Sequence, residues 1–204
     1  MGAKASGLSA LFEYGFSVPN GYAISKKVLE LYTIEKNFPD GFTQSLESCL
    51  VGLNSQKIII RSSAIGEDSD SFSFAGQLDS FVVQNNMEAA LEAILKCWDG
   101  LHNDRVLAYE KLSGKKLVEM GVVLQEFVEA DYAGVTFTSS PYHVDQIYTE
   151  YVKGAGEQLV SGKVTPKNFT VNFTETPKQK LPFNAVELIR LATTLKENYG
   201  YHID

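Results

Sequence analysis

Residues 57–81 read KIIIRSSAIGEDSDSFSFAGQLDSF, a hydrophobic run that gives way within a few residues to a polar segment containing glycine. The three consecutive isoleucines predict a strand from Lys57 to Arg61 that is buried on both faces. An arginine at the end of such a strand can project its planar guanidinium beyond the sheet and bind phosphate oxygens through two parallel hydrogen bonds. Arg61 is therefore a candidate anion ligand. A solvated hairpin loop, in which Arg61 pairs with Glu67 or Asp68, explains the same composition equally well.

The composition indicates a globular protein and excludes several classes of function. The chain has 204 residues, 44% of them hydrophobic, and a formal net charge of −7, which argues against binding nucleic acid through a broad basic surface. Its two cysteines, Cys49 and Cys97, lie far apart in sequence and outside any metal-ligand spacing, so we expect reduced core thiols and not a disulfide framework or a zinc site. No apolar run approaches the roughly 20 residues that span a membrane, and the first residues lack the basic-then-apolar pattern of a secretory signal. We therefore expect a cytoplasmic protein with neither a membrane nor a nucleic acid as partner.

Helical and strand patterns alternate along the chain. Helices are expected over 5–15, 25–37, 42–53, 87–112 and 184–200. Strands are expected within 16–25, 57–61, 79–84, 118–141, 146–154 and 167–173. Leu8, Leu11 and Phe12 form the apolar stripe of the first helix, and Trp98 is expected to pack in the core. The mixture of helices and mostly antiparallel strands predicts an α+β protein with two lobes that meet near residues 125–128.

Five blocks of sequence resemble a known family in order and in chemical character. They are GAKASGLSALFEYGFSVPNGYAIS, IIIRSSAIGEDSDSFSFAGQLDSF, ILKCWDGLHNDRVLAYEKLSG, GVVLQEFVEADYAGVTFTSSP and GAGEQLVSGKVTPKNF. Together they resemble the ATP-binding domain of phosphoenolpyruvate synthase and its relatives, pyruvate phosphate dikinase and rifampin phosphotransferase. The resemblance implies an ATP-grasp fold with the nucleotide site between two lobes. Residues 1–127 would form the N-terminal lobe, and 128–204 a C-terminal lobe truncated at the metal-binding strand.

The resemblance implies roles in phosphate binding for four residues. Lys4 is similar to the family's phosphate-contacting lysine near the start of the first helix, although a solvated surface lysine explains it as well. Arg61 is similar to the strand-end arginine that holds the triphosphate, and these two would be the catalytic cations. Residues 73–77 resemble a loop that folds over the phosphates, in which Gly76 permits close approach of the backbone and Gln77 follows it.

Two further groups of residues carry roles implied by the resemblance. Gln125, Glu126 and Val128 resemble the segment between the lobes that contacts adenine through a side-chain amide, main-chain groups and apolar contact; the same residues also suit a strand core. Asp204 resembles the first of two acids that hold Mg²⁺, whereas the second acid does not follow it. Lys167 stands where the family usually has an acid, which leaves the pairing around Glu157 and Thr165 open.

The implied function is phosphoryl transfer from ATP, with Mg²⁺, to a histidine on another domain or chain. None of His102, His143 and His202 fits the family's phosphocarrier motif, so the partners would be a phosphocarrier-histidine domain and an acceptor-binding domain. The isolated chain is not expected to turn over pyruvate. The alternative is a non-catalytic module that keeps the fold and senses nucleotide. A P-loop kinase is a weaker third hypothesis, because no glycine-rich stretch ends in Gly-Lys-Ser/Thr.

Overall fold

The computed structural model of the chain describes residues 2–64, 68–69, 72–73, 78–113, 119–141, 143 and 145–199. Helices and antiparallel sheets are mixed throughout these residues, so the predicted α+β class is confirmed. Contacts between residues divide the chain into two compact units, 1–128 and 129–204. The assignment of 1–127 and 128–204 to two lobes of one nucleotide site stays a prediction.

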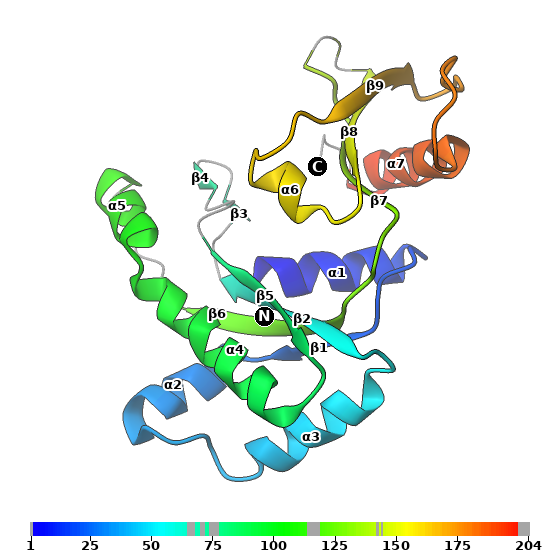
Figure 1. Cartoon of the computed structure of the whole chain (residues 1–204). Coiled ribbons are helices and arrows are strands. Elements are labelled where there is room, and N and C mark those ends of the chain that lie inside the picture. The colour runs from blue at the N-terminus through cyan, green and yellow to red at the C-terminus, as the bar shows by residue number, and fades with distance from the viewer. Residues whose placement is uncertain are drawn as a thin grey trace. The chain divides into compact units, whose positions relative to one another are not determined.

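A four-stranded antiparallel sheet organises the first unit (Figure 1). Its strands, in spatial order, are β1 (Gly21–Ile24), β6 (Met120–Glu126), β2 (Lys57–Ala64) and β5 (Ser80–Gln84). A short separate pair is formed by β3 (Asp68–Ser69) and β4 (Phe72–Ser73). In the central strand β2, Arg61 lies opposite Ser80 on one side and Val123 on the other.

The core of the first unit lies between one face of this sheet and three helices. These helices are α2 (Lys26–Glu35), α3 (Phe42–Gly52) and α4 (Met87–Asp99). Ile58 and Ile60 of β2 face them and are fully buried. Trp98 is 4% exposed and packs near Tyr32 and Phe38, with ring centroids 5.5 and 5.9 Å away, so its predicted packing role is confirmed.

The opposite face of the sheet carries helix α1 (Ala3–Glu13), as Figure 1 shows. Ile59 points to this face, because side chains alternate along a strand, and it is only partly buried. The prediction that the isoleucine strand is buried on both faces is therefore only partly right. The face that contains Ile59 and Arg61 is the less completely covered side of the sheet.

The single long helical period predicted over 87–112 is wrong. Helix α4 ends at Asp99, a 3₁₀ turn follows over Gly100–His102, and α5 (Asp104–Ser113) begins anew. The side-chain oxygen of Asn103 accepts a hydrogen bond of 2.8 Å from the amide of Val106, which caps the new helix. Because Asn103 takes an extended backbone conformation, the helical ladder is interrupted there.

The second unit is a three-stranded antiparallel sheet with a helix packed against it (Figure 1). Its elements are β7 (Tyr132–Phe137), β8 (Gln146–Lys153), α6 (Glu157–Val160), β9 (Lys167–Asn172) and α7 (Ala185–Tyr199). Buried side chains of β8 and β9, including Ile147 and Phe169, form a core with Ile189 of α7. The short helix α6 was not predicted. No helix in the described ranges combines the length and the apolar character needed to cross a membrane.

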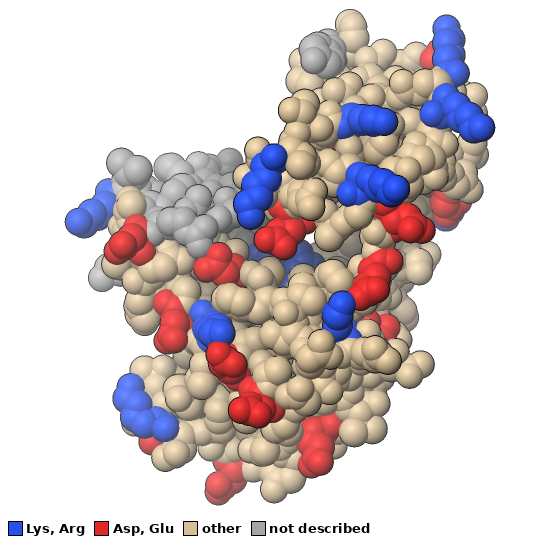
Figure 2. Space-filling model, in the orientation of Figure 1, with Lys and Arg blue, Asp and Glu red and all other residues tan. Residues whose placement is uncertain are grey.

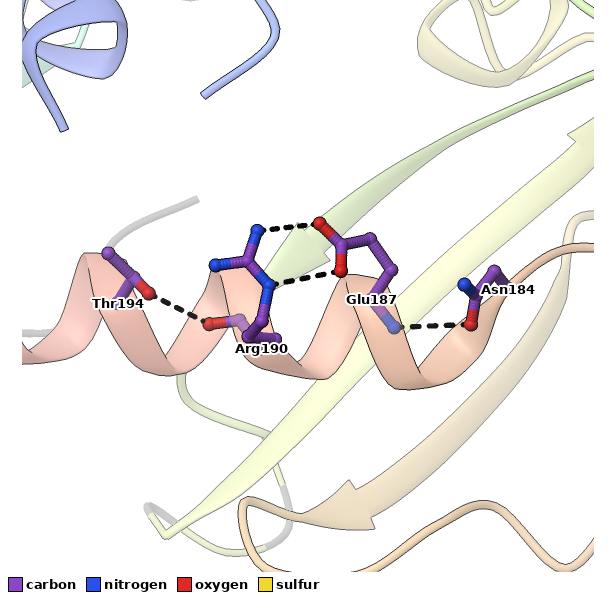
Figure 3. Close-up of polar contacts among 4 residues, drawn as sticks. All are labelled: Asn184, Glu187, Arg190 and Thr194. Carbon is purple, nitrogen blue, oxygen red and sulfur yellow. Dashed lines mark hydrogen bonds and ion pairs between the residues drawn. The ribbon is translucent and has the colours of Figure 1, made fainter. Parts of the chain in front are cut away.

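Polar contacts fix the start and the exposed side of α7 (Figure 3). Asn184 accepts a hydrogen bond of 3.3 Å from the amide of Glu187 at the helix start. The Arg190 guanidinium donates two hydrogen bonds, of 2.6 and 3.0 Å, to the Glu187 carboxylate. Each partner shifts the other's pKa, so the pKa of Glu187 is lowered and that of Arg190 is raised. Because the pair is exposed, its contribution to stability is small.

Candidate functional site

The start of α1 is held directly against β2. The amide of Ala5 donates a hydrogen bond of 3.1 Å to the buried hydroxyl of Ser63. Gly2, immediately before the helix, lies so close to β2 that an added Cβ would be 1.9 Å from the Ser63 carbonyl oxygen. Only glycine therefore fits at this contact. Lys4, in the first turn of α1, is consequently placed over the end of β2.

Arg61 and the helix that carries Lys4 lie on the same face of one sheet. Arg61 and Ser63 are two residues apart on β2, so their side chains share a face, and Ser63 bonds the helix that carries Lys4. The Ser63 hydroxyl, which the sequence suggested only as one of a run of small polar groups, thus anchors α1. This hydrogen bond could not be predicted from the residues around Ser63, because its partner lies far away in the sequence.

The Cys97 thiol lies on the other face of β2 and contacts the backbone of this strand beside Arg61. Its Sγ donates to the carbonyl of Ile60 at 3.9 Å, and the residue is 1% exposed. Burial raises the pKa of Cys97 to about 11, and a hydrogen bond with Ser62 is the main influence that opposes this rise. The thiol is therefore a core group rather than a nucleophile at neutral pH.

Residues predicted to contact adenine lie at the end of β6, where two of their side chains already have partners. The Gln125 side chain is 5% exposed and donates a hydrogen bond of 3.0 Å to the Pro19 carbonyl. The Glu126 carboxylate accepts from the amide of Asn54 at 2.9 Å. Val128, by contrast, is 59% exposed. Of these three residues, Val128 therefore has the side chain that a ligand can contact most readily.

An open pocket of about 340 Å³ lies between α1 and the β1–β6 edge of the sheet. Gln125 and Val123 line it from β6, and Leu8 and Phe12 line it from α1. Lys4, Arg61, Glu126 and Val128 are not on its lining. Phe12, expected on the apolar stripe of the first helix, is 72% exposed.

The remaining predicted site residues, Gly76, Gln77 and Asp204, lie outside the described residues. Within the described ranges, no group of three or more His, Cys, Asp and Glu residues could hold a metal ion. In the second unit, Glu157 begins helix α6, and Thr165 lies in the connection that leads to β9.

Comparison with known proteins identifies the family. Residues 33–198 match the family described as "Pyruvate phosphate dikinase, AMP/ATP-binding domain". The chain belongs to this family. It is thus a nucleotide-binding domain of the pyruvate phosphate dikinase and phosphoenolpyruvate synthase type, and the recognised resemblance is confirmed. Lys4 precedes the matched range, whereas Arg61 and Gln125 lie within it.

Similar proteins include three from bacteria and archaea. The "Uncharacterized phosphotransferase YvkC" of Bacillus subtilis is 29% identical over 88% of this chain and 24% of its own length. A "Probable phosphoenolpyruvate synthase" of Methanothermobacter thermautotrophicus is 38% identical over 60% of this chain and 18% of its own length. A "Rifampicin phosphotransferase" of a Streptomyces species is 37% identical over 57% of this chain and 14% of its own length. The chain therefore corresponds to a quarter or less of each of these relatives.

Proposed function

We propose that this domain binds ATP and supplies its phosphate to a histidine on another domain or chain, from which pyruvate or another small acceptor receives it. The match to an AMP/ATP-binding domain over residues 33–198 carries the proposal. The partners would be a phosphocarrier-histidine domain and an acceptor-binding domain, on the same chain or a different one. Relatives named as a phosphoenolpyruvate synthase and a rifampicin phosphotransferase support this class of reaction.

In this proposal, Lys4 and Arg61 neutralise the phosphates of ATP. Phosphoryl transfer asks little covalent chemistry of the protein and depends on positioning and on cations that offset developing charge. The bond from Ala5 to Ser63 supports the pairing, because it fixes the first turn of α1 on the face of β2 that carries Arg61. Arg61 would hold two phosphate oxygens with its planar group, and Lys4 would act as a point charge.

Adenine would lie against the end of β6. The exposed side chain of Val128 supports an apolar contact with the ring. The side-chain nitrogen of Gln125 already donates to Pro19, and the carboxylate of Glu126 already accepts from Asn54. We therefore assign the hydrogen bonds to adenine to main-chain groups and to the side-chain oxygen of Gln125.

The phosphate loop and the metal complete the proposed site. Gly76 would let the backbone approach the phosphates closely, and Gln77 would follow it in the closing loop. Asp204 would be a ligand of Mg²⁺, which, when bound, offsets the charge of the phosphate oxygens. Magnesium in such sites is commonly held by one or two carboxylates together with the phosphates of the substrate. One carboxylate from this chain fits that pattern.

Titration of the purified chain with ATP, with and without Mg²⁺, tests the proposal. Calorimetry should show binding that becomes tighter when Mg²⁺ is present. Binding that is indifferent to the metal would favour a nucleotide-sensing module instead of a phosphotransferase domain. A folded chain that binds no ATP under either condition would contradict the proposal.

A further inference from the structure

An open pocket of about 330 Å³ lies at one end of the three-stranded sheet of the second unit. It is formed where β7 and β9 begin and β8 ends, with α6 beside it. Its polar and aromatic lining consists of Tyr132, Tyr151, Lys153, Gln158, Thr165 and Lys167. None of these residues is among the proposed ATP ligands.

The register of the strands places two tyrosines and two lysines on the same face. Tyr132 lies opposite Lys153, and Tyr151 lies opposite Lys167. Directly paired residues share a face, and so do residues two apart on a strand, such as Tyr151 and Lys153. Lys153 and Lys167 are therefore diagonal neighbours, typically about 7 to 8 Å apart at the backbone, and their long side chains can reach one ligand.

The charge of this pocket is opposite to that of the chain. The whole sequence has 25 acidic and 18 basic residues, yet the lining includes two lysines and no acid. Within the described residues, no ion pair joins Lys153 or Lys167 to a carboxylate. Figure 2 shows that Lys and Arg side chains are prominent on the visible face of the second unit. The two ammonium groups are thus available to an anion.

The aromatic wall of the pocket is held in place by the core. Tyr151 is 8% exposed, and its ring forms a T-shaped pair with that of Phe183 at a centroid distance of 5.0 Å. Tyr132 packs 6.5 Å from Tyr151 and 6.4 Å from Phe183. Because these rings pack against the core, the ordering cost on binding falls on the exposed side chains of Lys153, Lys167, Gln158 and Thr165.

We propose that this pocket binds a small phosphorylated ligand through a diphosphate group. Two lysines supply charge to adjacent phosphates, while the Thr165 hydroxyl and the Gln158 amide supply neutral hydrogen-bond donors. A pocket of about 330 Å³ is at the small end of the range for small-molecule sites, which suits a diphosphate or a compact ester of one. The site goes beyond the proposed function, because it uses neither Lys4 nor Arg61.

Calorimetric titration with inorganic pyrophosphate tests this site. The titrations are made in a Lys4→Ala, Arg61→Ala background, so that the two proposed phosphate-binding cations of the first unit do not contribute. We expect pyrophosphate to bind, and Lys153→Met with Lys167→Met to weaken it at least about tenfold, as loss of two charge-assisted contacts predicts. The matched control is Lys178→Met with Lys180→Met, which removes two exposed lysines of the same unit outside the pocket and should leave binding unchanged.

Three results would overturn the proposal. The first is the absence of pyrophosphate binding, and the second is equal weakening by both pairs of substitutions, which would indicate only a general charge effect. The third is binding of malonate, a dicarboxylate of similar size, as tight as that of pyrophosphate and equally sensitive to Lys153 and Lys167. Preference for pyrophosphate with selective loss in the pocket variant supports a diphosphate site. ATP affinity, measured separately with Arg61 intact, tests the proposed function independently.

Discussion

Arg61 lies on the less completely covered face of a central strand, where its guanidinium is proposed to hold the triphosphate. Arg61→Ala should weaken ATP binding by about 1.5 to 3 kcal/mol, the usual size of a lost charge-assisted hydrogen bond. The measurement is a calorimetric dissociation constant on a variant whose circular dichroism spectrum is native. Arg190→Ala is the matched control, because that guanidinium pairs with Glu187 on the exposed side of α7. An Arg61→Ala variant with unchanged affinity would remove this residue from the site.

Cys97 gives the fold a dependence on alkaline pH. Its pKa rises from 9.0 to about 11 on folding, so between these values the unfolded chain binds fewer protons than the folded chain. The free energy of unfolding is therefore unaffected by this group below pH 9. Between pH 9 and about pH 11 it falls by about 1.4 kcal/mol for each pH unit. Urea unfolding of wild type and Cys97→Ala between pH 8 and about pH 10.5 isolates the effect, because other groups titrate alike in both.

At neutral pH, Cys97→Ala should lower stability by about 1 kcal/mol through lost packing and should leave ATP affinity unchanged. A stability difference between wild type and variant that stays constant from pH 8 upward would argue against the raised pKa. Altered ATP affinity at an unchanged melting temperature would argue against a purely structural role.

The roles of some residues could be predicted from the sequence, whereas the roles of others depend on contacts with residues distant in the chain. Trp98 was predicted correctly as core because it belongs to a helical apolar stripe. The partners of Gln125 and Glu126 could not be predicted, because Pro19 and Asn54 approach them only in the folded chain. Phe12 lies in a helix as its spacing predicted, yet the residue is 72% exposed, which the spacing did not indicate.

At the scale of elements, the contact of α1 with β2 should control the position of Lys4. Gly2→Ala places a Cβ 1.9 Å from the Ser63 carbonyl oxygen, so the start of the helix must move. We expect a lower melting temperature and weaker ATP binding. Gly7→Ala is the control within the same helix, because its Cβ would meet nothing within 4 Å, and it should stabilise by about 0.5 to 1 kcal/mol.

Two results would decide against this account of α1. If Gly2→Ala binds ATP as tightly as Gly7→Ala, the contact with Ser63 does not position a ligand. If both variants lose ATP affinity equally, the effect arises from a general change in the helix and not from the contact of its start with β2.

Helices and strands were largely predictable, and the errors have local causes. Strands β5, β6, β8 and β9 lie within predicted ranges because their apolar residues are continuous or alternate clearly. Strand β2 continues three residues beyond the predicted range 57–61, to Ala64, so Arg61 lies within the strand and not at its end as predicted. The break after α4 was missed because the apolar period continues through it, whereas the cap at Asn103 depends on a single side chain. The sequence HND contained that signal, since asparagine and aspartate favour helix starts.

At the scale of the whole molecule, each compact unit has its own hydrophobic core, which suggests partly independent unfolding. Ile147→Ala removes a fully buried side chain of the second unit and should destabilise that unit by about 2 to 5 kcal/mol. Hydrogen exchange should show faster opening of β8 and β9, while the fluorescence transition of Trp98 in the first unit stays near its wild-type position.

Ile94→Ala, equally buried in the first unit, is the matched control and should shift the Trp98 transition instead. If both substitutions shift that transition equally, the two units unfold as one, and the proposed division into lobes has no energetic counterpart.

The fold class followed from patterns in the sequence, and the family followed from the order of five blocks, which the match over residues 33–198 confirms. Site residues at Gly76, Gln77 and Asp204 stay predictions, because they lie outside the described residues. The pocket at Lys153 and Lys167 had no sequence signal beyond the lysine in place of an acid, because cross-strand register creates it.

The central claim is that Lys4 and Arg61 act together on the phosphates of one nucleotide. The most direct test is calorimetric titration of wild type, Lys4→Ala, Arg61→Ala and the double variant with ATP and with AMP. Each single substitution should lower ATP affinity at least about tenfold, with little change for AMP, which lacks the distal phosphates. Native folding with wild-type ATP affinity in both single variants, or equal losses for ATP and AMP, would contradict the claim.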